Sequence, residues 1–279
     1  MNIPIDTKNG VAYQDAIDQI LDCYGTGTWL QETNELFPTC RLGCINFGYW
    51  EYVPDTIPLE AREKSQLDLY KNLFDFSGIN KALTATILEI GCGRGHGVHL
   101  LSENGHNSYG IDLVVSQIQK CMRNYPNLAS KFKQGLSNHS GFLSDTFNFV
   151  ISIEAAQHFY SFFDFAQESY RILKEDGVLA ITTFFFTKET SKREIKDLIP
   201  PGVIGTHFVI PIDDAKNFLE QAGFRNIKII SIGAFVFHGF CKWAVQSMSK
   251  KNHTPKWVEA YEKGFIDYYM ISAEKKISC

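Results

Sequence analysis

The sequence lacks a strong net charge, a long hydrophobic run and a leader-like N-terminus. Its 27 basic and 31 acidic side chains leave a formal charge of −4 over 279 residues, which gives no general attraction to nucleic acid. No stretch approaches the roughly 20 consecutive apolar residues that span a bilayer. Residues 1–10 contain no basic segment followed by an apolar run, as a secretory signal would. We therefore expect a cytoplasmic protein with neither a membrane span nor a nucleic-acid partner.

The seven cysteines indicate neither a disulfide framework nor a zinc site. Cys40 and Cys44 are four residues apart, but no second Cys or His pair has a spacing that would complete a zinc site. Free thiols in a reducing compartment are the expected state. Apolar residues make up 44% of the chain, which is ordinary for a packed domain. The chain is therefore long and apolar enough for one α/β domain with additions.

From residue 87 onward, short β-type runs alternate with helical patterns. Strands separated by helices predict a parallel sheet with right-handed crossovers and helices on both faces. We expect a Rossmann-like, doubly wound, mostly parallel α/β fold with seven strands. The expected strands are 87–91, 108–114, 131–136, 147–155, 177–186, 225–232 and 265–275, and the expected helices are 92–101, 116–124, 163–174 and 213–223.

Two parts of the chain stand outside this alternation. Residues 1–80 carry helical patterns near 11–24 and 59–76, with an irregular stretch between them, and are predicted to form an N-terminal helical lid. Residues 81–279 would form the main domain. Within that domain, the insertions at 187–212 and 235–260 are further candidates to cover a small-molecule site.

The sharpest local signal is LEIGCGRGHG at 88–97. A strand that carries Glu89 leads directly into Gly91, Gly93 and Gly95, and glycine allows a tight turn and the close approach of a ligand. A dinucleotide-binding G-x-G-x-x-G loop would need its third glycine at position 96, which is His96. A phosphate-binding P-loop is also excluded, because no G-K-[ST] follows.

A second acid, Asp112, closes the next predicted strand, 21 residues after Gly91. A carboxylate at that place can accept hydrogen bonds from both hydroxyls of a ribose. Either acid alone has a structural alternative, since Glu89 could be a solvated strand end and Asp112 a helix cap. In parallel sheets a ligand binds beyond the carboxyl ends of the strands, so the loops after Gly91, Asp112 and Glu154 share one edge. Together they indicate an adenosine-type cofactor.

Here the sequence resembles the class I S-adenosylmethionine-dependent methyltransferases. The resemblance covers about residues 45–275 and rests on LEIGCGRG, supported by GIDLVVSQI, SDTFNFVISIEAAQHF and YRILKEDGVLAITTF. The upstream INFGYWE and the downstream AAQHF are similar to the branch that methylates sugars, tocopherols, sterols, quinone precursors and other natural products. The resemblance implies S-adenosyl-L-methionine as cofactor, S-adenosyl-L-homocysteine as its product, and a small-molecule acceptor that is partly apolar.

The resemblance also implies roles for individual residues. The glycine loop would cradle the methionine part of the cofactor, with Glu89 beneath it, and Asp112 would hold the ribose. Leu113 would lie against the adenine. The residues implied in cofactor binding are Tyr49, Glu89, Gly91, Gly93, Gly95, Asp112, Leu113, Ser137 and Glu154.

Three of these assignments depend on less specific positions. Tyr49 matches the tyrosine of a G-Y-W segment that often covers the cofactor near its sulfonium. Ser137 falls in the loop after the third strand, where the family often has an acid that contacts the adenine. The text there is KQGLSNHSG, so backbone or Ser137 itself would make that contact. Glu154 ends the fourth strand at the same edge.

His158, just after the fourth strand, is the candidate catalytic base. A histidine near its ordinary pKa can take a proton from an acceptor hydroxyl, and the resemblance places His158 beside the methyl group. The alternative is a histidine held by backbone partners that only shapes the pocket. Thr182 and Thr183 stand where some relatives have an aspartate, so no carboxylate is expected to orient the imidazole.

Three functional hypotheses are open at this point. The first is methylation of a small molecule, with an oxygen acceptor preferred to nitrogen or carbon because of His158. The second is methylation of a macromolecule, which neither a basic stripe nor an Asn/Asp-Pro-Pro-aromatic tetrapeptide supports, since residues 154–157 read Glu-Ala-Ala-Gln. The third is a cofactor-binding protein that lacks transfer activity.

Overall fold

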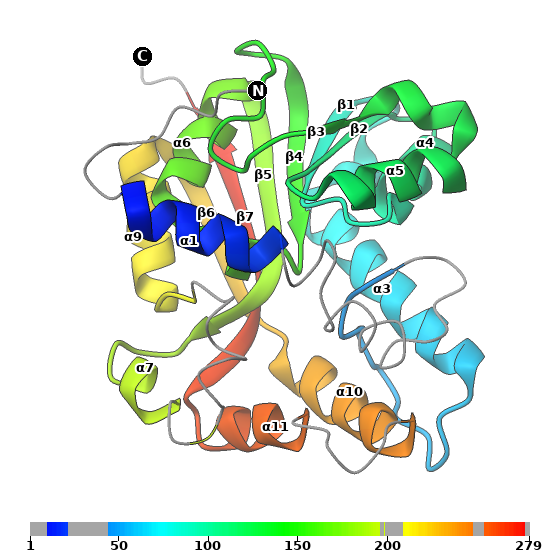
Figure 1. Ribbon diagram of the computed structural model, residues 1–279, viewed down its shortest axis with the longest axis vertical. Helices are drawn as coiled ribbons and strands as arrows, with labels where there is room; N and C mark the ends of the chain where they lie inside the picture. The colour runs from blue at the N-terminus through cyan, green and yellow to red at the C-terminus, as the bar shows by residue number, and fades with distance from the viewer. Residues whose placement is uncertain (1–9, 22–43, 196–197, 199–208, 248–253, 277–279) are drawn as a thin grey trace.

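A computed structural model describes residues 10–21, 44–195, 198, 209–247 and 254–276. One seven-stranded sheet crosses the molecule in the order β3-β2-β1-β4-β5-β7-β6 (Figure 1). All pairs among β1 to β5 are parallel, whereas β7 runs antiparallel to both β5 and β6. The strands are β1 Thr86–Ile90, β2 Asn107–Asp112, β3 Phe132–Gln134, β4 Phe147–Ile153, β5 Leu173–Phe186, β6 Phe224–Ser231 and β7 Ile266–Lys275. The predicted doubly wound fold is confirmed.

Strand order reverses between β1 and β4, because the chain runs outward from β1 through β2 to β3 and then returns to β1's other side. Such a switch point leaves a crevice at the carboxyl ends of the two strands. The residues that follow β1, β2 and β4 therefore meet at one edge of the sheet.

Helices cover both faces of this sheet (Figure 1). Successive strand residues point to opposite faces, so Ile87 joins a core with α3, α10 and α11 while Leu88 joins a second core with α6 and α9. The helices are α1 Gly10–Leu21, α3 Leu59–Ser77, α4 His96–Glu103, α5 Val115–Asn124, α6 Phe162–Ile172, α7 Ser191–Glu194, α9 Ile212–Ala222, α10 Gly233–Ser247 and α11 Thr254–Glu262, with short 3₁₀ turns η2 Ile79–Lys81, η3 Pro126–Lys131 and η4 Ala156–His158.

Local signals fix several helix ends. The Ser161 side chain accepts a hydrogen bond from the Asp164 N–H at the start of α6, a standard N-cap. Helix α9 has Asp213 and Asp214 in its first turn and is capped at its C-terminus by Gly223. The φ of Gly223 is 107°, a left-handed conformation that favours glycine. The helix expected at 213–223 is therefore found almost at its predicted bounds.

The structure differs from the expected elements around β5. The helix expected to continue to residue 174 ends at Ile172, because Leu173 adopts an extended conformation and pairs with Phe147 of β4. Strand β5 therefore begins at Leu173 rather than at 177, with a register irregularity in its pairing with β4. Strand β3 is also shorter than the predicted 131–136.

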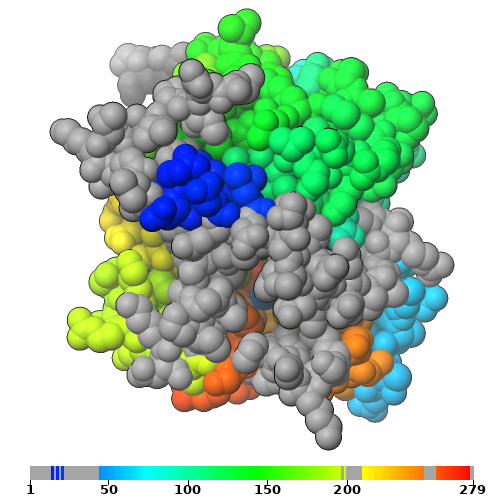
Figure 2. All heavy atoms as spheres, in the orientation of Figure 1, coloured from blue at the N-terminus to red at the C-terminus, as the bar shows by residue number. Residues whose placement is uncertain are grey.

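The predicted insertion at 235–260 contains two helices, α10 and α11, which pack on one another and against β7. Figure 2 shows them along the lower edge of the molecule, with the residues of β2 to α5 in its upper part. Helix α3 shares its core with the sheet. The division at residue 80 and the lid roles stay predictions, and residues 22–43 and most of 196–208 lie outside the described part. Within that part, no helix combines the length and apolar character needed to cross a membrane.

Candidate functional site

The loop after β1 is built on three glycines in the left-handed region. Gly91, Gly93 and Gly95 have φ of 77°, 51° and 86°. A Cβ at Gly91 would overlap the Ala155 side chain, and one at Gly95 would lie 2.9 Å from the Phe132 ring. A Cβ at Gly93 would meet nothing within 4 Å. Two of the glycines are thus required by packing, while Gly93 borders open space that a ligand can use.

Asp112 links this loop to the end of β2. Its Oδ2 accepts the Gly93 N–H at 2.9 Å and its Oδ1 accepts the Val114 N–H at 2.9 Å. Burial raises the pKa of this half-buried carboxyl to about 6, and the two N–H donors oppose that rise. The structure therefore brings Asp112 and the glycine loop together. Leu113 comes next in the chain, and its carbonyl accepts a hydrogen bond from Gln134 Nε2 at 3.0 Å.

Glu89 lies beneath the loop and is only 1% exposed. Tyr70 of α3 donates its O–H to Glu89 Oε1 at 3.3 Å, whereas Oε2 is buried and has no hydrogen-bond partner in the described part of the chain. Burial raises the pKa of Glu89 to about 8. A Cβ at Gly97 would lie 2.5 Å from Oε2, so glycine is needed there as well. A buried acid without a cationic partner fits a site for a positively charged ligand.

Glu154 occupies the end of β4 in an unusual conformation, with φ of 46°. Its Oε1 accepts the Phe47 N–H at 2.6 Å and the Tyr268 O–H at 2.6 Å. Burial raises its pKa to about 7, against the effect of these two bonds and of the Arg62 charge. The carboxyl thus joins β4 to the segment before α3 and to β7, in addition to its predicted place at the cofactor edge.

His158 lies on η4, the short turn that follows β4. Its backbone N–H donates to Ala155 O at 2.9 Å. Its neighbour Gln157 is 6% exposed; it accepts the Thr183 hydroxyl at 2.6 Å and donates to Glu154 O at 2.9 Å. Thr183, which the sequence presented only as the absence of an aspartate, therefore anchors the turn that carries His158.

Tyr49 and Ser137 lie on segments that flank this edge. Tyr49 is half-buried, and its backbone N–H donates a hydrogen bond to Ser65 O at 2.7 Å. Its ring stacks on that of Phe235, with the two centroids 4.8 Å apart. Ser137 is half-buried in the turn between Leu136 and His139. Neither makes a described contact with the glycine loop, so their cofactor roles stay predictions.

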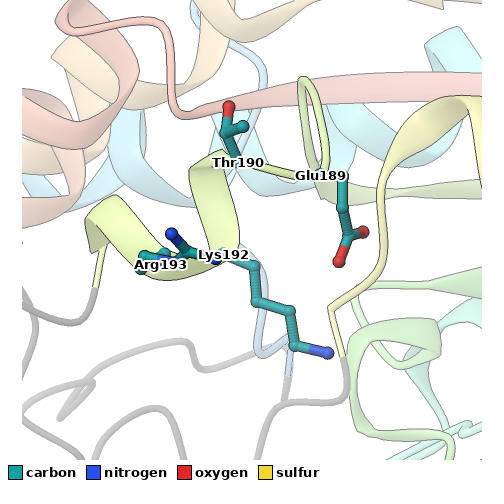
Figure 3. Close-up of a pocket in the computed structure, with 4 residues that line it drawn as sticks. All are labelled: Glu189, Thr190, Lys192 and Arg193. Atoms are coloured by element: carbon teal, nitrogen blue, oxygen red, sulfur yellow. The ribbon is translucent and has the colours of Figure 1, made fainter.

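A hollow of about 330 Å³ lies elsewhere, beside α7. Exposed side chains line it, and Glu189 and Lys192 extend toward the same space while Thr190 and Arg193 project away (Figure 3). None of the predicted site residues lines this hollow, so it is separate from the candidate cofactor site.

Several residues that shape the site were not predicted from the sequence. They are Tyr70, which holds Glu89; Gln157 and Thr183, which hold the His158 turn; and Arg62 and Tyr268, which act on Glu154. Arg62 and Tyr70 had one available signal: they are polar residues that recur at helical spacing with the apolar Leu69 and Leu73, all four of which are buried in α3.

The chain is similar to known methyltransferases. A family model described as a methyltransferase domain matches residues 49–229. The phthiotriol/phenolphthiotriol dimycocerosates methyltransferase of Mycobacterium leprae is 32% identical over 202 residues, which cover 71% of this chain and 68% of that protein. The erythromycin 3''-O-methyltransferase of Saccharopolyspora erythraea is 26% identical over 200 residues, which cover 67% of this chain and 64% of that protein.

A solved structure has the same fold. The geranyl diphosphate C-methyltransferase of Streptomyces coelicolor, crystallised with Mg²⁺, geranyl-S-thiolodiphosphate and S-adenosyl-L-homocysteine, superposes with a TM-score of 0.77. The superposition covers 93% of this chain and 98% of that one at 13% identity, and it therefore supports the fold alone. Because the family model covers more than half of the sequence, the chain belongs to the methyltransferase domain family and is an S-adenosylmethionine-dependent methyltransferase.

Proposed function

We propose that this protein transfers the methyl group of S-adenosylmethionine to an oxygen atom of a partly apolar small molecule. The observation that carries the proposal is the position of His158 on η4, whose preceding residue Ala155 packs directly on Gly91. A potential base thus lies on a turn that contacts the cofactor loop. Both curated relatives are named for small-molecule acceptors, and one of them for an O-methylation.

The cofactor would lie along the edge formed by the ends of β1, β2 and β4. Gly93 leaves space for it, and Asp112 would hold the ribose. A bound cation would lower the raised pKa of Glu89, so that this carboxyl would release its proton and offset the positive charge of the methionine end. We assign Tyr49, Gly91, Gly95, Leu113, Ser137 and Glu154 to the surrounding walls of this site.

S-adenosylmethionine, when bound, supplies a methyl group on a sulfonium leaving group. The chain has to hold the acceptor atom in line with that methyl group, within about 3–3.5 Å. His158 would take the proton from the acceptor hydroxyl, and a positioned base of this kind contributes on the order of 10²–10⁴-fold in rate. Gln157 and Thr183 would keep the turn that carries His158 in place.

Aromatic side chains support a partly apolar acceptor. The Phe47 ring stacks on Phe240 at 4.0 Å and lies 6.2 Å from Phe184. The backbone of the same Phe47 binds Glu154, so this aromatic group adjoins the proposed methyl-transfer edge. Aromatic faces also tolerate a nearby cation.

The test separates binding from transfer. Binding of S-adenosyl-L-homocysteine is measured by calorimetry, and tritiated methyl transfer is measured against a library of phenols, sugars and lipids. His158→Ala should retain cofactor affinity and lower turnover on the order of 100-fold or more. Unchanged turnover removes His158 from the mechanism, and a product methylated on carbon or nitrogen overturns O-methylation.

A further inference from the structure

Arg62, in the first turns of α3, is a buried cation with an exposed fraction of only 2%. Its Nη2 donates to Asn46 O at 2.5 Å and its Nη1 to Phe47 O at 2.7 Å. The guanidinium also lies over three aromatic rings, with centroid distances of 5.8 Å to Trp50, 5.5 Å to Phe240 and 4.5 Å to Trp243. An arginine side chain is rarely buried this fully unless its charged group is paired with neighbouring groups.

The Asn46–Phe47 peptide group connects this cation to the candidate site. The peptide oxygen accepts from Arg62, and the N–H of the same peptide donates to Glu154 Oε1 at 2.6 Å. One peptide group is therefore held between a buried cation and a half-buried carboxyl, and each bond polarises the other. The same segment also packs closely on α3 at Gly48, where a Cβ would overlap the Ser65 side chain.

Glu154, at the end of β4, has a constrained backbone conformation that depends on these contacts. Its left-handed φ of 46° is uncommon for a residue other than glycine and persists only where the surroundings impose it. Its N–H donates to Thr182 O at 2.8 Å, its carbonyl accepts from Gln157, and its carboxyl holds Phe47 and Tyr268.

The residue after Glu154 transmits its position. Ala155 packs so closely on Gly91 that no Cβ fits between them, and Ala155 O accepts the N–H of His158. A change in the Glu154 conformation would therefore displace the glycine loop and the His158 turn together.

From these contacts we propose that Arg62 is a positioning residue for the cofactor site, acting through the Asn46–Phe47 peptide and Glu154 on the glycine loop. The proposal relies on the placement of the cofactor at that loop, which forms part of the proposed function. It relies neither on the acceptor nor on His158. A failure of O-methylation and a failure of this proposal are therefore distinguishable.

The experiment is a double-mutant cycle on the full chain, with S-adenosyl-L-homocysteine affinity measured by calorimetry. Arg62→Met and Glu154→Gln should each weaken binding about tenfold or more, equal to about 1.4 kcal/mol. The double variant should bind no more weakly than the weaker single variant, because both changes interrupt one connection. Multiplied effects, or an Arg62→Met affinity within about twofold of the unaltered chain, would overturn the proposal.

Lys275 provides a matched control. It is also a buried cation, whose Nζ donates a hydrogen bond to Leu173 O at 2.7 Å and lies 4.9 Å from the centroid of the Tyr170 ring. It lies, however, near the ends of the parallel strands opposite to the candidate site. Lys275→Met should reduce thermal stability and leave the affinity unchanged. If Arg62→Met does not fold, Tyr268→Phe replaces it, because it removes one donor to Glu154 Oε1 with little change of shape. Tyr268→Phe should then weaken binding several-fold and show the same lack of additivity with Glu154→Gln, and unchanged binding would contradict the connection.

Discussion

At the residue scale, the three glycines of the loop after β1 share a left-handed backbone conformation but are needed for different reasons. Gly91 and Gly95 are fixed by neighbouring side chains, whereas the side of Gly93 that a Cβ would occupy is open. Sequence spacing indicated a ligand loop but could not separate these roles, because the neighbours Ala155 and Phe132 come from later parts of the chain.

Replacement of Gly93 tests this distinction. Gly93→Val should abolish binding of S-adenosyl-L-homocysteine, by on the order of 100-fold or more, equal to about 2.7 kcal/mol, because the new side chain fills the ligand space. The circular dichroism spectrum should stay native. Calorimetry and circular dichroism provide the two measurements.

Gly105 is the control for backbone strain. It has a similar left-handed φ of 84° and open space at its Cβ, but it precedes β2 at the other end of the sheet. Gly105→Val should cost comparable stability, about 1–2 kcal/mol, with no effect on binding. Equal loss of binding in both variants would show that strain, and not the ligand space, explains the result.

At the element scale, the turn η4 depends on a strand that lies well beyond it in the sequence. Thr183 of β5 donates to Gln157 Oε1 at 2.6 Å, and both residues are buried. Thr183→Val should leave the amide oxygen unpaired, at a cost of about 1–3 kcal/mol, and should speed hydrogen exchange across residues 154–158. Denaturant unfolding and exchange mass spectrometry measure the two effects.

Thr182 offers the neighbouring comparison, because its hydroxyl bonds to Tyr269 O rather than to the turn. Thr182→Val should lower stability without faster exchange at 154–158. Faster exchange in both variants would indicate general loosening of β5 and would argue against a specific anchor.

The same scale shows what the sequence could and could not predict. The seven strands, the glycine loop and Asp112 follow from local patterns: apolar runs, strand ends and glycine spacing. Contacts across long sequence separations, such as Phe47 to Glu154 and Tyr268 to Glu154, leave no local signal. The start of β5 at Leu173 was also missed, because its pairing with Phe147 overrode a helical pattern.

At the scale of the whole molecule, acids with raised pKa values at one edge of the sheet link folding stability to pH. The pKa of Glu89 is about 8 in the fold against an ordinary 4.5, so the native state holds a proton that the unfolded chain releases. Stability is therefore full below about pH 4.5 with respect to this group and falls as pH rises toward 8, by up to about 1.4 kcal/mol per pH unit.

The effect of His96 on stability has the opposite pH dependence, because burial lowers the pKa of this imidazole from 6.5 to about 4. Its contribution to stability is present above 6.5 and declines as pH falls toward 4. Between pH 7 and 8 the Glu89 effect is therefore the dominant one of the two. Glu154, with a pKa of about 7, adds to the Glu89 effect at the lower end of that interval.

Denaturant unfolding at several pH values from 7 to 8 tests the predicted effect of Glu89 on stability. Stability of the unaltered, ligand-free chain should fall with pH, and Glu89→Gln should remove most of that slope. Glu168→Gln serves as comparison. Burial raises the pKa of this carboxyl, but hydrogen bonds from Arg171 and Ser140 outweigh burial, lower the pKa below its ordinary value and keep the group ionised throughout the interval. A slope that survives in Glu89→Gln would refute the assignment.

The strand order has a further consequence for how such an enzyme can diversify. In the proposed function the nucleoside is held by residues at the ends of β1 and β2, whereas α10, α11 and residues 44–49 pack in a core shared with β5 and β7. Exchange of α10 and α11 for those of a relative would alter the apolar wall and spare the Gly93–Asp112 contact. A chimera of this kind could acquire new acceptors while inheriting its methyl donor intact.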